Sequence, residues 1–178
     1  MSDKSITLVE LILSMVLLSV IVLAAVSFDH ASRFLFQSSE RTTLVLNDLT
    51  LILEHLAKYV SLATGDRGNY PAIEKLSGTR LRIRNDIRNT PDNYVDDIAS
   101  EYTWDGSRNF TFTRSGSSTR LSGRVAAFSF STPAVNQVRV ETLTLRYDPT
   151  NPTVDPKTNP EVSLPSQITI SSFSSSAN

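Results

Sequence analysis

A long apolar run near the N-terminus constrains this chain more than any other feature. Residues 6–28 read ITLVELILSMVLLSVIVLAAVSF, and Glu10 is the only charged residue among them. As a helix, this run would be about 34 Å long, which is enough to cross the hydrocarbon core of a bilayer. The first glycine or proline of the chain is Gly65, so a helix that begins here can continue far beyond the apolar run. We therefore expect a membrane-spanning helix.

Glu10 separates this run from ordinary hydrophobic segments. A carboxylate costs on the order of 2.5–3.5 kcal/mol at the middle of a membrane and less near one end, where Glu10 lies. A signal peptide would need a basic leader, a shorter apolar core and a cleavage site of small residues, whereas only MSDKS precedes this run. A plain signal anchor would explain the length of the run but not its carboxylate. Ionisable groups in such segments usually have a partner and a function.

The residues around Glu10 resemble a processing motif. Residues 4–11 read KSITLVEL, and with the apolar run to about Phe28 they are similar to the N-terminal cleavage and methylation motif of the type IV pilin and type II secretion pseudopilin family. The resemblance implies that a prepilin peptidase cuts between Ser5 and Ile6, and that Ile6 becomes the N-methylated first residue. Glu10 would then be fifth in the mature chain, where the family has its assembly carboxylate. Ser5 departs from the glycine that the family almost always has before the cut.

Beyond Phe28 the apolar pattern becomes one-sided. Apolar and small residues recur at alternating spacings of four and three, at Ala31, Leu35, Ser38, Thr42, Val45, Leu49, Ile52, Leu56 and Tyr59. This heptad stripe predicts that a single helix covers residues 7–62 and that its second half is amphipathic. We expect the stripe to pack under a sheet of the same chain. A parallel coiled-coil dimer is the alternative, although Ser38 and Thr42 would be weak members of its seam. Gly65 is expected to end the helix.

From residue 65 on, alternation replaces the helical period. The predicted strands are residues 79–84, 109–113, 119–121, 124–131, 137–147 and 166–173. Their apolar residues lie on one face, which is typical of an antiparallel sheet with one solvated side. In the longest strand the inward set changes parity between Val140 and Leu143, which predicts a β-bulge near Glu141 and Thr142. Residues 88–100 and the proline-rich residues 148–165 are expected to be surface loops.

Together these patterns predict an α+β protein, in which a long N-terminal helix packs under an antiparallel β-sheet as in pilins. The expected segments are a leader peptide (1–5), a transmembrane and filament-core helix (6–28), the amphipathic half of the same helix (29–64), an extracytoplasmic β-domain (65–173) and a disordered tail (174–178). The strands and their order also resemble, more distantly, the larger minor pseudopilins.

The composition offers little material for catalysis. The chain has no cysteine, which excludes disulfides and thiolate metal ligands, and its two histidines, His30 and His55, both fall in the predicted helix. The sequence contains no nucleophile elbow or phosphate-binding loop, so we do not expect an enzyme. The formal net charge is −1, and basic and acidic residues are interspersed, so a nucleic-acid-binding face is not favoured either.

Acidic and amide residues of the two loops are the candidate ligands for a metal, which would be calcium. They are Asp92, Asp96, Asp97 and Glu101 in the first loop region and Asp148, Asn151 and Asp155 in the second. Their spacing is not that of an EF-hand, because no glycine stands where that loop turns. We expect solvated acidic loops and no cofactor. We also expect the aromatic residues Tyr70, Tyr94, Tyr102 and Trp104 to pack at the sheet edge rather than to form an adhesive patch.

The resemblance implies a structural role. The chain is expected to be a subunit, and a minor one, of a type IV pilus or type II secretion pseudopilus. It would cross the inner (cytoplasmic) membrane once, with its N-terminus cytoplasmic and its C-terminal domain periplasmic or extracellular, before it enters a filament. The implied partners are other pilins or pseudopilins, the prepilin peptidase, the inner-membrane assembly platform and membrane lipid. Two alternatives are a membrane-anchored binding domain that does not polymerise and a DNA-uptake pilin.

Overall fold

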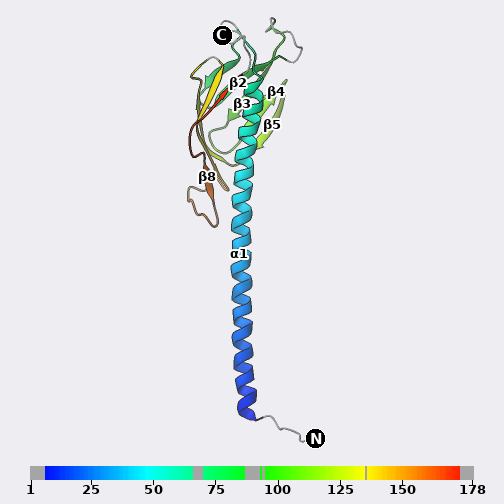
Figure 1. The fold of residues 1–178 in the computed structure, drawn as a ribbon, viewed down its shortest axis with the longest axis vertical. Helices are drawn as coiled ribbons and strands as arrows, with labels where there is room; N and C mark the ends of the chain where they lie inside the picture. Colours follow the sequence, from blue (N-terminus) through cyan, green and yellow to red (C-terminus); the bar gives the residue numbers. More distant parts are fainter. Residues whose placement is uncertain (1–6, 66–69, 87–92, 94, 135, 173–178) are drawn as a thin grey trace.

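One long helix carries a small β-domain at its C-terminal end (Figure 1). The computed structural model describes residues 7–65, 70–86, 93, 95–134 and 136–172. The helix, α1 (Leu8–Ser61), has 54 residues and is about 81 Å long at 1.5 Å per residue. Its caps are Thr7 and Leu62, so the prediction of a single helix over residues 7–62 is confirmed. We call residues 8–28 of α1 its apolar half and residues 29–61 its amphipathic half.

The sequence predicts that Gly65 ends the helix, but the helix ends before this residue. Its C-cap is Leu62, and Ala63 already forms an isolated bridge with Asn85. Gly65 serves a different purpose, because a Cβ atom at this position would lie 2.3 Å from the backbone nitrogen of Ala72. Only a residue without a side chain allows these two backbone segments to approach so closely.

The β-domain contains two antiparallel sheets instead of the single predicted sheet. The first has five strands in sequence order: β1 (Ile73–Ser77), β2 (Arg80–Asn85), β3 (Ile98–Trp104), β4 (Phe110–Arg114) and β5 (Ser117–Ser122). The second consists of β6 (Val125–Ser131), β7 (Gln137–Arg146), β8 (Glu161–Ser163) and β9 (Ile168–Ser171). In this sheet β7 pairs with β6 along one edge and with both β8 and β9 along the other.

The ladder between β6 and β7 contains the predicted bulge. Ser129 pairs with Thr142 and Phe130 pairs with Val140, which leaves Glu141 as the extra residue. Two predicted loops are too long, however. β3 begins at Ile98, inside predicted loop 88–100, and β8 lies inside the proline-rich segment. Both segments form strands because they pair with a neighbouring strand. Their own sequence patterns do not show this pairing.

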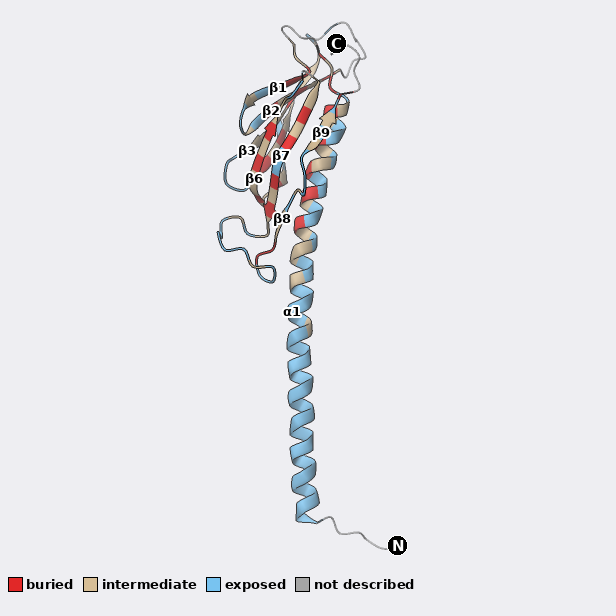
Figure 2. Cartoon of the chain, turned by 60° about the vertical axis from the view of Figure 1, so that its left-hand side comes forward, coloured by how far each residue is buried: buried red, intermediate tan, exposed pale blue. Residues whose placement is uncertain are grey.

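The core lies where the amphipathic half of α1 meets both sheets (Figure 2). The helix contributes Val45, Leu49, Ile52, Leu56 and Val60. The predicted stripe is therefore confirmed from Val45 onward, and it packs on the chain's own strands rather than on a second helix in a coiled coil. Nearer the N-terminus the stripe is uncovered, with Leu35 69% exposed, because the β-domain does not extend that far along α1.

Candidate assembly and membrane-insertion site

The apolar half of α1 is uncovered throughout its length. Every residue from position 7 to position 31 is exposed, and Leu8 and Val9 keep 75% and 73% of their surface accessible. α1 is long and apolar enough to cross a membrane. In water such a surface is unfavourable by about 25 cal/mol for each Å² of apolar area. Covering this half of the helix with an apolar environment is therefore favourable.

Thr7 and Glu10 form a capping box at the start of α1. The Thr7 hydroxyl oxygen accepts a hydrogen bond from the backbone N–H of Glu10 at 3.3 Å. In return, Oε2 of Glu10 accepts hydrogen bonds from the Thr7 backbone N–H at 2.9 Å and from the Thr7 hydroxyl at 3.0 Å. Two backbone donors that a helix start leaves unpaired are thus satisfied within the chain. The carboxylate also lies at the helix end where the macrodipole favours negative charge.

The capping box leaves part of the Glu10 carboxylate accessible. Both hydrogen bonds from Thr7 use Oε2, and within the described part of the chain Oε1 accepts none. Glu10 can therefore cap its own helix and still accept a hydrogen bond from a further donor. Ser5 and Ile6, the residues on either side of the expected cut, lie outside the described residues.

The serine hydroxyls of the apolar half bond to the backbone of the same helix. Ser19 donates to the Met15 carbonyl at 2.7 Å, Ser27 donates to the Leu23 carbonyl at 2.8 Å, and Ser14 donates in the same way to the Glu10 carbonyl. A hydroxyl that bonds to the carbonyl four residues earlier does not need water. These serines therefore add little to the cost of placing the helix in hydrocarbon.

Between the apolar half and the core, the loop between β7 and β8 lies along α1. It is anchored by three contacts: Ser38 to the Pro156 carbonyl (3.2 Å), Arg41 to the Thr158 carbonyl (2.8 Å), and Lys157 Nζ over the Phe34 ring (5.5 Å to its centre). Buried Asn159 holds the loop together by donating hydrogen bonds to the carbonyls of Asp148, Asn151 and Thr153. The proline-rich segment is thus a loop fixed to the helix.

The candidate calcium ligands of the described residues do not form a metal site. Within the described residues there is no group of three or more His, Asp or Glu side chains that could hold a metal ion. Glu101 lies on β3 and forms ion pairs with Arg80 at 2.7 Å and Arg82 at 2.8 Å. Asp97 instead accepts a hydrogen bond from the Thr64 hydroxyl at 3.0 Å. Asp92 lies outside the described residues.

The second set of candidate ligands organises its own loop. Asp148 accepts hydrogen bonds from the backbone N–H and hydroxyl of Thr150, and Asn151 accepts one from Thr153. The Asp155 carboxylate accepts hydrogen bonds from the backbone N–H of Lys157 and from the hydroxyl of Thr158. These side chains therefore stabilise turns through local hydrogen bonds.

The four aromatic residues have separate environments. Tyr102 is fully buried in the core, and Trp104 is half-buried against it. The Tyr70 ring lies under the guanidinium of Arg84, with 5.4 Å between Cζ and the ring centre. Tyr94 lies outside the described residues. Tyr102 and Trp104 pack as expected, but they do so on β3, the central strand of its sheet, and not at the sheet edge.

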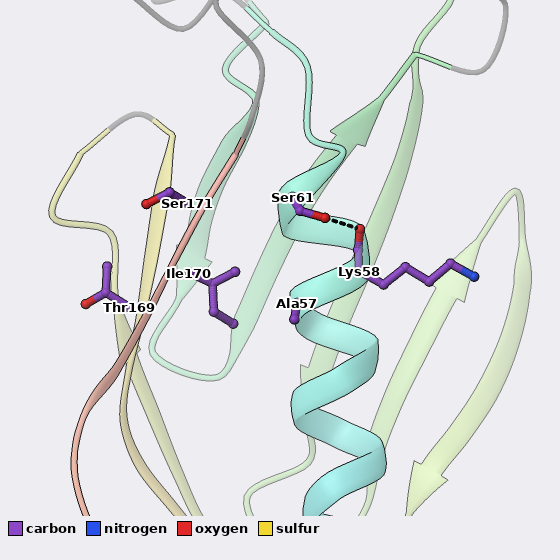
Figure 3. A pocket seen from close by; sticks show the side chains of 6 residues that line it. All are labelled: Ala57, Lys58, Ser61, Thr169, Ile170 and Ser171. Atoms are coloured by element: carbon purple, nitrogen blue, oxygen red, sulfur yellow. Dashed lines mark hydrogen bonds between the residues drawn. The ribbon is translucent and has the colours of Figure 1, made fainter.

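A shallow groove of about 510 Å³ runs between the end of α1 and the edge strand β9 (Figure 3). Ile170 points across it towards Ala57, and the Ser61 hydroxyl is bonded to the Lys58 carbonyl at 3.0 Å. Among the described residues that line the groove, Lys58 is the only titratable one.

The feature that sets this molecule apart is the uncovered apolar half of α1, capped by Thr7 and Glu10. Glu10 could be identified from the sequence, whereas its partner Thr7 was missed, although the spacing Thr-x-x-Glu is the signature of a capping box. No protein-family model matches the chain, and no curated protein and no solved structure matches it either.

Proposed function

We propose that this chain is a structural subunit of a type IV pilus or type II secretion pseudopilus. The observation that carries the proposal is the division of one continuous helix into two parts. The amphipathic half is built into the β-domain, whereas the apolar half is fully uncovered. A monomer can keep such a helix in the inner membrane, with the β-domain periplasmic or extracellular. In a filament, the apolar halves of neighbouring subunits replace the lipid.

The continuity of α1 favours a filament subunit over a simple membrane anchor. An anchor needs only to hold its domain near the membrane, and a flexible linker serves that purpose. In this chain 54 helical residues join the apolar half to the core without a break. A rigid connection of this kind fixes the position of the β-domain relative to the packed helices, which a regular filament requires.

Glu10 is proposed to select and align the incoming subunit. Cleavage after Ser5 would give Ile6 a free amine, one helical turn before Glu10. A buried, unpaired charge is costly in hydrocarbon, so a neighbour that supplies the opposite charge is favoured. The capping box supports this role, because Glu10 Oε1 remains able to accept a hydrogen bond from such an amine.

The test is co-purification of the chain with its filament in a host that has the assembly machinery. Glu10→Gln keeps the shape of the side chain and removes its charge, so incorporation should fall while membrane insertion is retained. Glu10→Leu should insert more readily into the membrane and assemble no better. Glu40→Gln is the matched control, because Glu40 is an exposed carboxylate of the same helix beyond the apolar half. Equal incorporation of all variants would show that Glu10 has no part in assembly. Absence of the wild-type chain from any filament would overturn the proposed function.

A further inference from the structure

A second heptad pattern lies on an uncovered face of α1. It runs from the apolar half into the amphipathic half at alternating spacings of four and three residues. Its members, which we call the second stripe, are Ile21, Ala25, Phe28, Ser32, Leu35 and Ser39. This spacing places them along one side of the helix, where large and small residues alternate. A strict alternation of four and three is typical of a face that meets another helix.

The β-domain leaves the second stripe uncovered (Figure 2). The residues of α1 that are buried in the core begin only at Val45. Phe28 is 75% exposed, and Leu35 is 69% exposed. The loop between β7 and β8 contacts other residues of α1, which are Phe34, Ser38 and Arg41. A partner can therefore reach the second stripe while these loop contacts remain in place.

The outer part of the second stripe surrounds a hollow of about 420 Å³, which we call the helix hollow. It is lined by residues of α1 alone: Phe28, Ser32, Leu35, Phe36 and Ser39. The last four follow the spacing i, i+3, i+4 and i+7. In a coiled coil, four residues of this kind form the hole that receives one side chain of the facing helix. The serines at its two ends have short side chains, so the hollow has room for a large apolar side chain.

Lipid does not cover the helix hollow. Leu35 lies seven residues beyond Phe28, which is about 10 Å along the helix axis. The headgroup region on each side of the hydrocarbon core is about 5–8 Å thick. With the apolar half in the hydrocarbon core, Leu35 and Ser39 therefore lie at or beyond the surface of the bilayer. The exposed apolar surface at this level is stabilised by a protein partner instead.

Membrane insertion makes a second copy of the chain the partner that fits. Each copy places its apolar half at the same depth and in the same direction, so two copies are parallel and equal residues stand at the same level. In a parallel pair in register, Leu35 of each copy enters the hollow between Ser32 and Ser39 of the other. The small residues of the stripe allow the two backbones to approach closely.

We propose that two copies of this chain form a parallel, in-register dimer through the second stripe while they are in the membrane. The dimer rests on the membrane insertion that the proposed function includes, but it needs no filament. It joins the same surface of both copies, so it closes after two. The bilayer is needed, because the part of the stripe beyond Phe28 is only about three helical turns long and too short to hold two copies together in water.

Cysteine cross-linking in membranes tests the contact. The chain has no cysteine, so an introduced cysteine can be read without background. The full-length chain is expressed in a host that lacks the assembly machinery, and its membranes are oxidised. Leu35→Cys and Ser32→Cys should each give a disulfide-linked dimer, and because each variant has one cysteine, the bond joins equal residues and reports the register. Gln37→Cys is the matched control, because Gln37 is exposed at the same level of α1 and lies outside the stripe. It should remain monomeric.

A charge placed in the helix hollow provides a second readout that introduces no thiol. Leu35→Glu puts a carboxylate into the contact and should abolish the dimer, whereas Gln37→Glu adds the same charge outside the stripe and should leave it unchanged. Energy transfer between copies with different fluorescent labels measures the dimer in lipid vesicles at a low ratio of protein to lipid.

The outcomes separate this dimer from the proposed function. A chain that is inserted but gives equal cross-linking at Leu35 and Gln37, or no cross-linking at all, would overturn the dimer and leave the proposed function intact. The same holds if Leu35→Glu and wild type show equal energy transfer, or if the cysteine at position 35 joins only to other proteins. A chain that does not insert into membranes would remove both proposals.

Discussion

The Nδ1 atom of His55 lies 2.8 Å from the Tyr102 hydroxyl oxygen, and the same hydroxyl donates a hydrogen bond to the backbone carbonyl of His55 at 3.1 Å. Because the hydroxyl has only one hydrogen, His55 must be the donor in the first bond. Its Nδ1 atom therefore carries the hydrogen, and Nε2 is the nitrogen that titrates. The pair joins α1 to β3 beside the core, where the His55 ring stacks on Tyr59 with 4.8 Å between ring centres.

This environment predicts that acidification destabilises the protein. Burial, and secondarily the charge of Lys58, lower the pKa of His55 below its ordinary value of 6.5. Between 6.5 and the folded-state pKa, the unfolded chain binds more protons at His55 than the folded chain does. The contribution of His55 to stability is therefore full above pH 6.5 and is lost as the pH falls towards the folded-state pKa.

Urea unfolding between about pH 5 and pH 8 measures this effect. The His55→Gln variant should lose much of the pH dependence in this range. His30→Gln should keep it, because His30 is exposed on α1. Unchanged pH dependence in His55→Gln would assign the effect to other groups.

The covered part of the heptad stripe predicts a sharp difference between neighbouring residues. Ile52 is fully buried, whereas Leu51 is 46% exposed. Ile52→Ala should lower the free energy of unfolding by about 2–5 kcal/mol, because it removes buried methyl groups and leaves a cavity. Leu51→Ala should change it by no more than about 0.5 kcal/mol. Chemical denaturation of both variants makes the comparison, and equal effects would mean that this side of α1 is not the packed one.

The exposure of the apolar half predicts that the remainder folds independently. All the buried residues of α1 lie between Val45 and Val60, so removal of residues 1–28 deletes no part of the core. The fragment 29–178 should be a folded monomer that unfolds cooperatively. Gel filtration and thermal unfolding followed by circular dichroism test this. An aggregated or unfolded fragment would show that the core depends on the deleted residues.

The local features of this fold could be predicted from the sequence. The helix was predictable because 54 consecutive residues lack glycine and proline and because those beyond Phe28 follow a helical period. The faces of the strands were predictable where apolar residues alternate, as with Leu81 and Ile83 on β2. The one-residue shift of the inward-facing side chains, which predicted the bulge at Glu141, could also be seen within a single strand. In each case the side chains of a short segment are sufficient to determine which face is buried.

The division into two sheets depends on how the strands pair with one another, which the side chains of single segments do not reveal, and it could not be predicted. β1 and β8 contain few apolar residues and become strands because β2 and β7 lie beside them. The cleft lined by Arg108, Arg120 and Tyr147 has the same origin, since these residues meet only after β4, β5 and β7 have been arranged. Thr7 was different, because its role as the cap was present in the sequence as a recognisable motif.

Processing of the N-terminus is the last prediction, and it concerns the residue that departs from the family pattern. The resemblance implies cleavage between Ser5 and Ile6. A serine side chain adds a hydroxymethyl group at a position that glycine almost always occupies in the family, so cleavage of this chain should be slower than that of a glycine variant. When prepilin peptidase is co-expressed, Ser5→Gly should be cleaved faster than wild type.

Intact-mass spectrometry reads the product directly. The mature chain should lack residues 1–5 and carry one methyl group on the amine of Ile6. Glu10→Gln serves as the control, because it should be cleaved like wild type and differ only in assembly. A chain that keeps Met1 to Ser5 in its native host would have no free amine at Ile6 to meet the Glu10 carboxylate of a neighbour. Such a chain would be a membrane-anchored domain, and the continuous helix would then serve to hold that domain away from the membrane.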